Sequence, residues 1–337
     1  MSLILLIIIF SLFILFNGRD EGVVNLGNSA LSSDWQVLYG KKEYNDFYRD
    51  QITSLFQLVN FIIWVVVFHY FYNFKVNYAK YLDLMSLLLW ISLVIQLLSA
   101  LIEVFALGVD RPSGTFGNAQ SLSFFMNIII AWFLSINKPV KIINFIAITI
   151  AVFTIYVSGT RSGMAIAGIL ILTYYIIPKG KKIRLIFLNL ALSLAVTFTL
   201  LFSYSDDFRE FVLLILTSFT SPLTMNLRGL MWSSFSYIFP SASLLGTYGI
   251  TVYFTDNFFW FFCISYGVCG LFFLFIFFKG LIKHSLDNKF ILLITLLIVI
   301  QSISYYGFFV ENLGWSLVAI IGLEFKRNYM WKYLNDK

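Results

Sequence analysis

Three arginines stand near glycines, two of them where apolar stretches begin and the third in a long connecting segment. Arg111 lies in "GVDRPSGTFGNAQ", Arg161 in "YVSGTRSGMAI" and Arg228 in "MNLRGLMW". A guanidinium group pairs bidentately with phosphate oxygens, and a neighbouring glycine lets a ligand approach the backbone. Because a diphosphate carries several such oxygens, the three arginines together predict a site for a diphosphate group.

A transfer reaction from a diphosphate also needs an acceptor for the proton of the attacking hydroxyl group. Asp256, in "YFTDNFFWF", precedes a long apolar run and is the candidate base, with Glu311 and Asp20 as alternatives. Asp256 has an equally ordinary interpretation as a helix N-cap. The identity of the base therefore stays open between these three carboxylates.

The arginines have an ordinary interpretation too, because an arginine at the end of a membrane span often extends its head group to the interface. Lysine would anchor a span equally well, yet these stretches use arginine, which favours phosphate recognition. Smaller polar and aromatic neighbours complete the predicted site as supporting residues: Gly114, Asn118, Ser162, Trp232 and Asn257.

The elements that must position these residues are membrane helices. The chain has 337 residues, of which 60% are hydrophobic and 12% charged, with a mean hydropathy of +0.86. Soluble domains carry about 25% charged residues, so residues 1–337 are predicted to form a single all-α integral membrane domain. A span needs about 20 apolar residues, which predicts ten spans, with nine to eleven as the range. They run approximately over 2–16, 54–74, 84–104, 120–136, 140–157, 162–178, 184–203, 257–279, 290–309 and 313–325.

The distribution of lysine and arginine predicts the orientation of these spans. With the N-terminus on one side, fifteen Lys and Arg fall in loops on that side and eight on the other. Positive residues mark cytoplasmic loops, so both termini are predicted to be cytoplasmic. The two larger external loops are then residues 17–53 and 204–256, and all the arginines named above face outward. His69 is expected near the cytoplasmic end of the second span and His284 in a cytoplasmic loop, which excludes histidine as the external base.

Several other functions lack support in the sequence. No His, Cys, Asp or Glu cluster has metal-ligand spacing, and no phosphate-binding loop or dinucleotide fingerprint occurs, so neither a metal nor a cofactor is expected. The net charge of +6 is explained mainly by cytoplasmic anchoring and predicts no nucleic-acid partner. The first apolar run lacks a basic leading region and a small-residue cleavage site, which predicts a retained span.

Four stretches, in this order, resemble the O-antigen polymerase and O-antigen ligase superfamily, whose members are multi-span inner-membrane glycosyltransferases of the GT-C type. These stretches are "RPSGTFGNAQ", "VSGTRSGMAI", Arg228 with Trp232 and "LLGTYG", and "TDNFFWFFCISYGVCGLFFL", so the resemblance covers residues 110–275. No single motif among them is specific; their order and common external placement carry the resemblance.

The resemblance implies an enzyme that acts on sugar chains held on undecaprenyl diphosphate at the periplasmic face of the bacterial inner membrane. It implies that Arg161 and Arg228, with Arg111 as an addition, bind the diphosphate. Ligases of the superfamily have a histidine where this chain has Asp256, so the resemblance favours the polymerase (Wzy-type) branch. Membrane lipids and a chain-length regulator are further partners that such a polymerase would have.

Three other functions remain open. The first is the O-antigen ligase, which shares the fold and the donor. The second is a transporter or flippase of lipid-linked sugars, although transporters place charge near the midplane and show internal repeats, which this sequence lacks. The third is a membrane scaffold, in which the external arginines would tolerate substitution.

Overall fold

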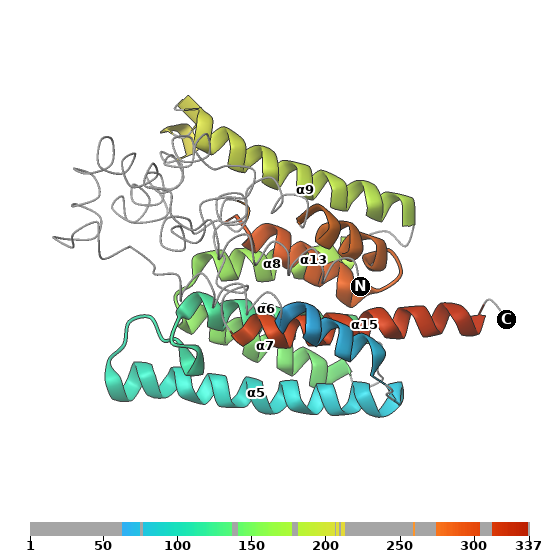
Figure 1. The fold of residues 1–337 in the computed structure, drawn as a ribbon. Helices are drawn as coiled ribbons and strands as arrows, with labels where there is room; N and C mark the ends of the chain where they lie inside the picture. The colour runs from blue at the N-terminus through green and yellow to red at the C-terminus, as the bar shows by residue number, and fades with distance from the viewer. Residues whose placement is uncertain are drawn as a thin grey trace, which may run out of the picture. The chain divides into compact units, whose positions relative to one another are not determined.

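The fold is described from a computed structural model, in which helices are the only regular elements of the described residues (Figure 1). The described residues are 63–74, 77–136, 141–176, 181–205, 207–208, 210–212, 259, 274–303 and 312–335. An all-α chain was predicted, and the described part confirms this class.

Seven α-helices and one short 3-10 helix account for most of these residues. The helices are α5 (Tyr78–Leu107), η2 (Gly114–Phe116), α6 (Ala119–Ser135), α7 (Lys141–Val157), α8 (Arg161–Ile176), α9 (Lys181–Tyr204), α13 (Lys289–Gln301) and α15 (Asn312–Asn335). Helical residues also occur at 63–73 and 274–285.

The chain divides into two compact units, and the unit formed by Val66–Ala191, Phe278–Gln301 and Gly307–Lys337 contains most of the described helices. Its centre is α6, which contacts α5, α7, α8 and α13 (Figure 1). Of the 17 residues of α6, 14 are buried, and 11 of the 13 residues of α13 are buried as well. These two helices therefore form the core of the unit. In the other unit, α9 continues to Tyr204, and the rings of Phe198 and Phe208 meet edge to face at 5.7 Å.

Apolar side chains cover the outer face of α5. Leu84, Leu87, Leu88, Ile91 and Ile95 recur at intervals of three and four residues and are all exposed. Such a stripe is the apolar face of a helix, and here it points away from the protein. Residues Lys80–Leu107 form a stretch long and apolar enough to cross a membrane, with 22% of its most apolar window buried.

Ile183–Leu201 of α9 is a second helix long and apolar enough to cross a membrane among the described residues. Four shorter apolar helices accompany these two: Ala119–Ser135, Ile142–Val157, Arg161–Ile176 and Lys289–Gln301. At 1.5 Å per residue, 17 residues reach about 26 Å, slightly less than the hydrocarbon thickness of about 30 Å. The described residues thus support a membrane-compatible helical protein.

Two predicted elements differ from the helices observed. The run 290–309 was predicted as one span, but α13 ends at Gln301 and a turn follows at residues 302–303. His284 was placed in a loop, whereas it belongs to the helical residues 274–285. That helix continues because His284 stacks on Phe325, with ring centroids 3.7 Å apart, and because Leu281 is buried.

Candidate anion-binding site

The loop of residues 108–118, which carries Arg111, is fastened to the last turn of α5. Glu103 accepts hydrogen bonds from the backbone N–H groups of Ser113 and Gly114, the second at 3.2 Å, and from Ser113 Oγ at 3.3 Å. Hydrogen bonds to a charged acceptor are stronger than neutral ones. The loop therefore has a defined position relative to α5 close to Arg111.

A second fastening point lies about two turns earlier on α5. Gln96 Oε1 accepts the N–H of Thr115 at 2.9 Å, and Gln96 Nε2 donates to Thr115 Oγ1. Gly114 has a φ of +59°, and a Cβ atom there would collide with the Gln96 side chain. The space that Gly114 leaves is thus filled by Gln96, which brings the loop close to the helix.

The turn between α7 and α8 brings Arg111 and Arg161 to one place. Gly159, in this turn, has a φ of +64°, and a Cβ atom built on it would lie 3.8 Å from Cγ of Arg111. Arg161 begins α8 two residues after Gly159, so their Cα atoms are at most about 7.6 Å apart. Two arginines that are far apart in the sequence are therefore neighbours in the fold.

The backbone at the start of α8 is held against α6. A Cβ atom on Gly163 would lie 2.6 Å from Oγ of Ser123, so only glycine permits this approach. Asn127 Nδ2 donates to the carbonyl oxygens of Ser123 at 3.0 Å and of Gly163 at 3.2 Å, which joins the two helices. Ser158 and Thr160, both buried, share a hydrogen bond of 2.8 Å in the preceding turn. The position of Arg161 is thus set by the packing of the start of α8 against α6.

Both guanidinium groups are available to an external ligand. Arg111 and Arg161 are exposed, and neither forms an ion pair or a hydrogen bond with any of the described residues. The first N–H groups of a helix are unpaired and carry about half a positive charge. Because Arg161 adds its charge to this end, and no acidic residue lies in the first turn of α8, the N-terminus of α8 itself favours an anion.

The structure assigns a capping role to one predicted residue. Asn118 is the N-cap of α6, and its Oδ1 accepts the N–H of Gln120 at 2.8 Å. Ser162 lies half-buried in the first turn of α8, next to Arg161. The other predicted site residues lie outside the described residues, and they are Asp20, Arg228, Trp232, Asp256, Asn257 and Glu311.

Comparison with protein-family models, with curated proteins and with solved structures found no match in any of the three. Function must therefore be inferred from the residues of the chain and their geometry. Among the described residues, no group of three His, Cys, Asp or Glu side chains is placed to hold a metal ion.

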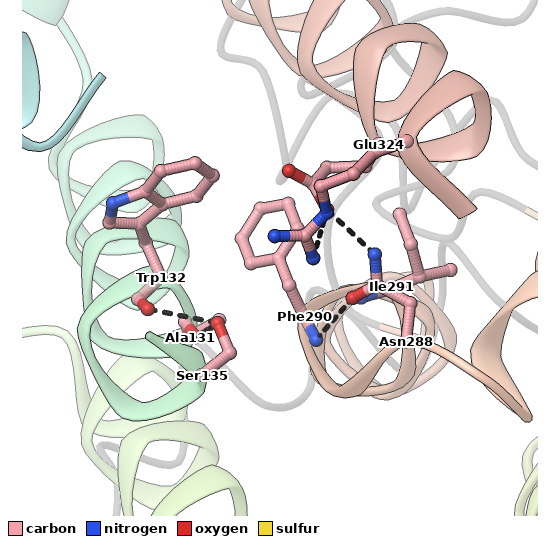
Figure 2. A network of polar contacts seen from close by, with 8 residues as sticks. Ala131, Trp132, Ser135, Asn288, Phe290, Ile291 and Glu324 are labelled. Carbon is pink, nitrogen blue, oxygen red and sulfur yellow. Dashed lines mark hydrogen bonds and ion pairs between the residues drawn. The ribbon is translucent and has the colours of Figure 1, made fainter. Parts of the chain in front are cut away.

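A second polar cluster, which the sequence analysis missed, surrounds Glu324 (Figure 2). The Glu324 side chain is fully buried, and its Oε2 lies 2.7 Å from Arg327 and 2.6 Å from Nδ2 of Asn288. Asn288 Oδ1 in turn caps α13 by accepting the N–H groups of Phe290 at 2.9 Å and Ile291 at 3.3 Å. One asparagine therefore links the start of α13 to a carboxylate on α15.

Aromatic rings connect the Glu324 cluster to α6 and α5. Trp132 of α6 meets Phe290 edge to face, with ring centroids 5.1 Å apart (Figure 2). Trp132 also meets Tyr81 of α5 edge to face, at 6.0 Å. Tyr81 and Glu103 are separated by 22 helical positions, which is about 33 Å along α5. The two clusters thus lie at opposite ends of the same unit.

Both carboxylates have a signal in the sequence, although a weak one. Glu103 and Glu324 are single acidic residues near the C-terminal end of apolar runs. Charge inside or at the edge of such a run is costly, and a carboxylate is unfavourable at a helix C-terminus. An acidic residue at such a location indicates a specific hydrogen-bond or ion-pair partner. The prediction of orientation counted only lysines and arginines and did not consider these carboxylates.

Proposed function

We propose that this chain is a multi-span membrane glycosyltransferase that polymerises lipid-linked sugar repeat units. In this proposal Arg161 and Arg111, together with Arg228, bind the diphosphate of an undecaprenyl-diphosphate-linked donor at the outer face of the bacterial inner membrane. The proposal includes ten spans and cytoplasmic termini, with the site facing the periplasm.

One observation carries the proposal: the Arg111 side chain lies against Gly159, two residues before Arg161 begins α8, and neither arginine forms an ion pair with a described residue. Two arginines on neighbouring segments give a local excess of positive charge, which an anion would offset. A diphosphate has enough oxygens to accept bidentate bonds from both arginines and a bond from a free backbone N–H of α8. Arginines that only anchor spans at the membrane interface would not need to lie on two neighbouring segments beside the same helix N-terminus.

The proposed transfer needs a base and a stabilised leaving group. The oxygen of an acceptor sugar hydroxyl attacks the anomeric carbon of the donor, the bond from that carbon to the diphosphate oxygen breaks, and the proton passes to a carboxylate. Asp256 is the proposed acceptor of that proton, with Glu311 and Asp20 as alternatives. The arginines and the end of α8 stabilise the charge that develops on the diphosphate.

The helix directions in the central unit support a membrane site at one end. Asn118 starts α6 and Thr160 precedes α8 at the end where Glu103 holds the loop. Both helices therefore present their N-termini on the same side of the unit. The exposed apolar stripe of α5 supports a lipid environment around it.

Complementation of a strain that lacks the gene tests this proposal. The surface polysaccharide is separated on a gel after expression of the wild type, Arg111→Ala, Arg161→Ala or Arg161→Lys at matched protein levels. We expect the alanine variants to leave attached single repeats without a ladder of longer chains. Arg161→Lys should retain only part of the ladder, since lysine binds phosphate as a point charge.

Lys80→Ala is the matched control, because Lys80 is an exposed cation near the opposite end of α5. This variant should leave the ladder unchanged. Loss of every attached sugar in the arginine variants, including the single repeat, would instead assign ligation or translocation to the chain. A complete ladder in both alanine variants would overturn the proposal.

A further inference from the structure

The carboxylate of Glu103 has an unusual location, in the last turn of α5 next to the apolar surface of that helix. The helix C-terminus carries partial negative charge, so an acidic residue is disfavoured there. Its hydrogen bonds all go to the loop: it accepts the backbone N–H groups of Ser113 and Gly114 and the hydroxyl group of Ser113. Among the described residues it forms no ion pair with a cation.

The backbone at Glu103 reinforces this arrangement. The N–H of Val109 donates to the carbonyl oxygen of Glu103 at 3.0 Å, and Gly108, which lies between them, has a φ of +64°. This hydrogen bond closes the chain around a left-handed glycine, a conformation that commonly ends a helix. Residue 103 therefore directs the chain away from α5 with its backbone and holds the returning loop with its side chain.

Arg111 follows the position of this loop closely. Only Pro112 separates it from Ser113, and Pro112 is buried and has a restricted φ. The stem of Arg111 lies against Gly159 of the neighbouring turn. A shift of the loop on α5 would therefore move Arg111 relative to Arg161.

We propose that Glu103 is a positioning residue that fixes Arg111 beside Arg161 through its hydrogen bonds to Ser113 and Gly114, so that both guanidinium groups contact one diphosphate. This inference rests on the proposed function. The Glu103 carboxylate accepts the backbone N–H groups of Ser113 and Gly114 and forms no ion pair with Arg111, so it holds the loop while the guanidinium group stays available to a ligand. Gln96 has no such role toward Arg111, since it holds the loop further along at Thr115.

Geometry and charge can be separated with two conservative variants of Glu103. Glu103→Gln keeps the chain length and one acceptor oxygen, which is enough because Oε2 alone accepts both N–H groups. Glu103→Asp keeps the charge but is one methylene shorter, so it moves or releases the loop. Glu103→Leu removes both the charge and the acceptor. A positioning role requires Gln to be tolerated and Asp to be harmful.

The probe is undecaprenyl diphosphate itself, and its binding to the purified full-length chain is measured by native mass spectrometry. We expect Glu103→Leu and Glu103→Asp to weaken binding about tenfold or more, the value of roughly one charge-assisted hydrogen bond. Glu103→Gln should stay within about threefold of the wild type. In an Arg111→Ala background, Glu103→Leu should add less than about threefold, whereas in an Arg161→Ala background its full effect should remain.

A distance measurement tests positioning without any ligand. Cys263 and Cys269 are replaced by serine, and spin labels are attached to Arg111→Cys and Ser162→Cys. We expect a narrow distance distribution in the parent and in Glu103→Gln, and a broad or shifted one in Glu103→Asp and Glu103→Leu. If the distribution stays narrow in all of them, Glu103 does not position Arg111 and the inference is wrong.

The two proposals fail in different ways. If Arg111→Ala and Arg161→Ala both bind undecaprenyl diphosphate as the wild type does, the diphosphate site is wrong. If those variants bind weakly but Glu103→Asp binds normally, or if Glu103→Leu weakens binding fully in the Arg111→Ala background, only the positioning role is overturned. If Glu103→Leu does not fold, Glu103→Asp and Glu103→Gln still provide the comparison.

Discussion

The two ends of the central unit use charged residues in opposite ways. At the Arg111–Arg161 end, two exposed guanidinium groups lie at one turn and have no acidic partner among the described residues. At the Glu324 end, a fully buried carboxylate has Arg327 at 2.7 Å and Asn288 at 2.6 Å. The first arrangement leaves charge for a ligand, and the second uses charge within the protein.

The difference also appears in what each carboxylate binds. Glu103 accepts backbone N–H groups and leaves the nearby Arg111 free, whereas Glu324 pairs with the arginine one turn away. A buried pair contributes little net stability but is costly to break, because the remaining charge stays in a poor solvent. Charge at the Glu324 end should therefore matter for folding, and charge at the Arg111–Arg161 end should matter for binding.

Removing Arg327 should have the largest effect on stability. Arg327→Leu leaves the Glu324 carboxylate buried without its cation, and we expect a loss of about 3 kcal/mol in unfolding free energy, the lower part of the usual range because Arg327 is one-third exposed. Thermal unfolding of the protein in detergent measures this. The double variant Glu324→Gln/Arg327→Leu should recover much of the loss, since neither charge then remains. A double variant as unstable as the single one would show that the pair is not the cause.

Removing Arg161 should give the reverse pattern. Arg161→Ala deletes a charge-assisted contact to the developing diphosphate charge, and we expect the rate of chain transfer to fall about 100- to 1000-fold. The melting temperature should stay within a degree or two, because the Arg161 side chain is exposed and forms no hydrogen bond or ion pair with a described residue. Transfer is followed by ladder formation in membranes, and melting in detergent. A large drop in melting temperature would place Arg161 in the structural class with Arg327.

The helices could be predicted from the sequence because their apolar runs are long and their ends are marked. The predicted runs 120–136 and 140–157 agree closely with α6 at Ala119–Ser135 and α7 at Lys141–Val157. Asn118 and Gly159 mark boundaries through capping and a positive φ. The all-α class was predicted from the apolar composition and from runs of about 20 apolar residues, because such a run crosses a bilayer as a helix.

The candidate site was predictable only in part. The sequence indicated that Arg111 and Arg161 stand beside glycines near helix starts, but their meeting at Gly159 depends on packing between segments far apart in the chain. The hydrogen-bond partners of Glu103 and Glu324 lie 10 and 36 residues away, and although each lone carboxylate indicates a partner, no local pattern says which residue it is. α13 is shorter than its apolar run, since the turn at residues 302–303 depends on tertiary structure.

A methyl group at the start of α8 should disturb the Arg111–Arg161 end through packing alone. Gly163→Ala places a Cβ atom 2.6 Å from Oγ and 2.7 Å from Cβ of Ser123, so we expect a loss of about 1 to 3 kcal/mol in unfolding free energy. Gly168→Ala is the control on the same helix, because nothing lies within 4 Å of the added atom. That variant should gain about 0.5 to 1 kcal/mol from reduced backbone entropy in the unfolded chain. Equal changes in both variants would show that α8 does not approach α6 as closely as described.

The smallest expected effect comes from two substitutions of Asn288, which distinguish its capping of α13 from its hydrogen bond to Glu324. Asn288→Ser keeps an oxygen that caps α13 but loses the bond to Glu324, whereas Asn288→Ala loses both. A cap is worth about 1 kcal/mol, so Asn288→Ala should be less stable than Asn288→Ser by that amount in thermal unfolding. Both variants should retain wild-type binding of undecaprenyl diphosphate, because Asn288 lies at the Glu324 end. Weakened binding in either variant would mean that the two ends are coupled, and the division of labour between them would fail.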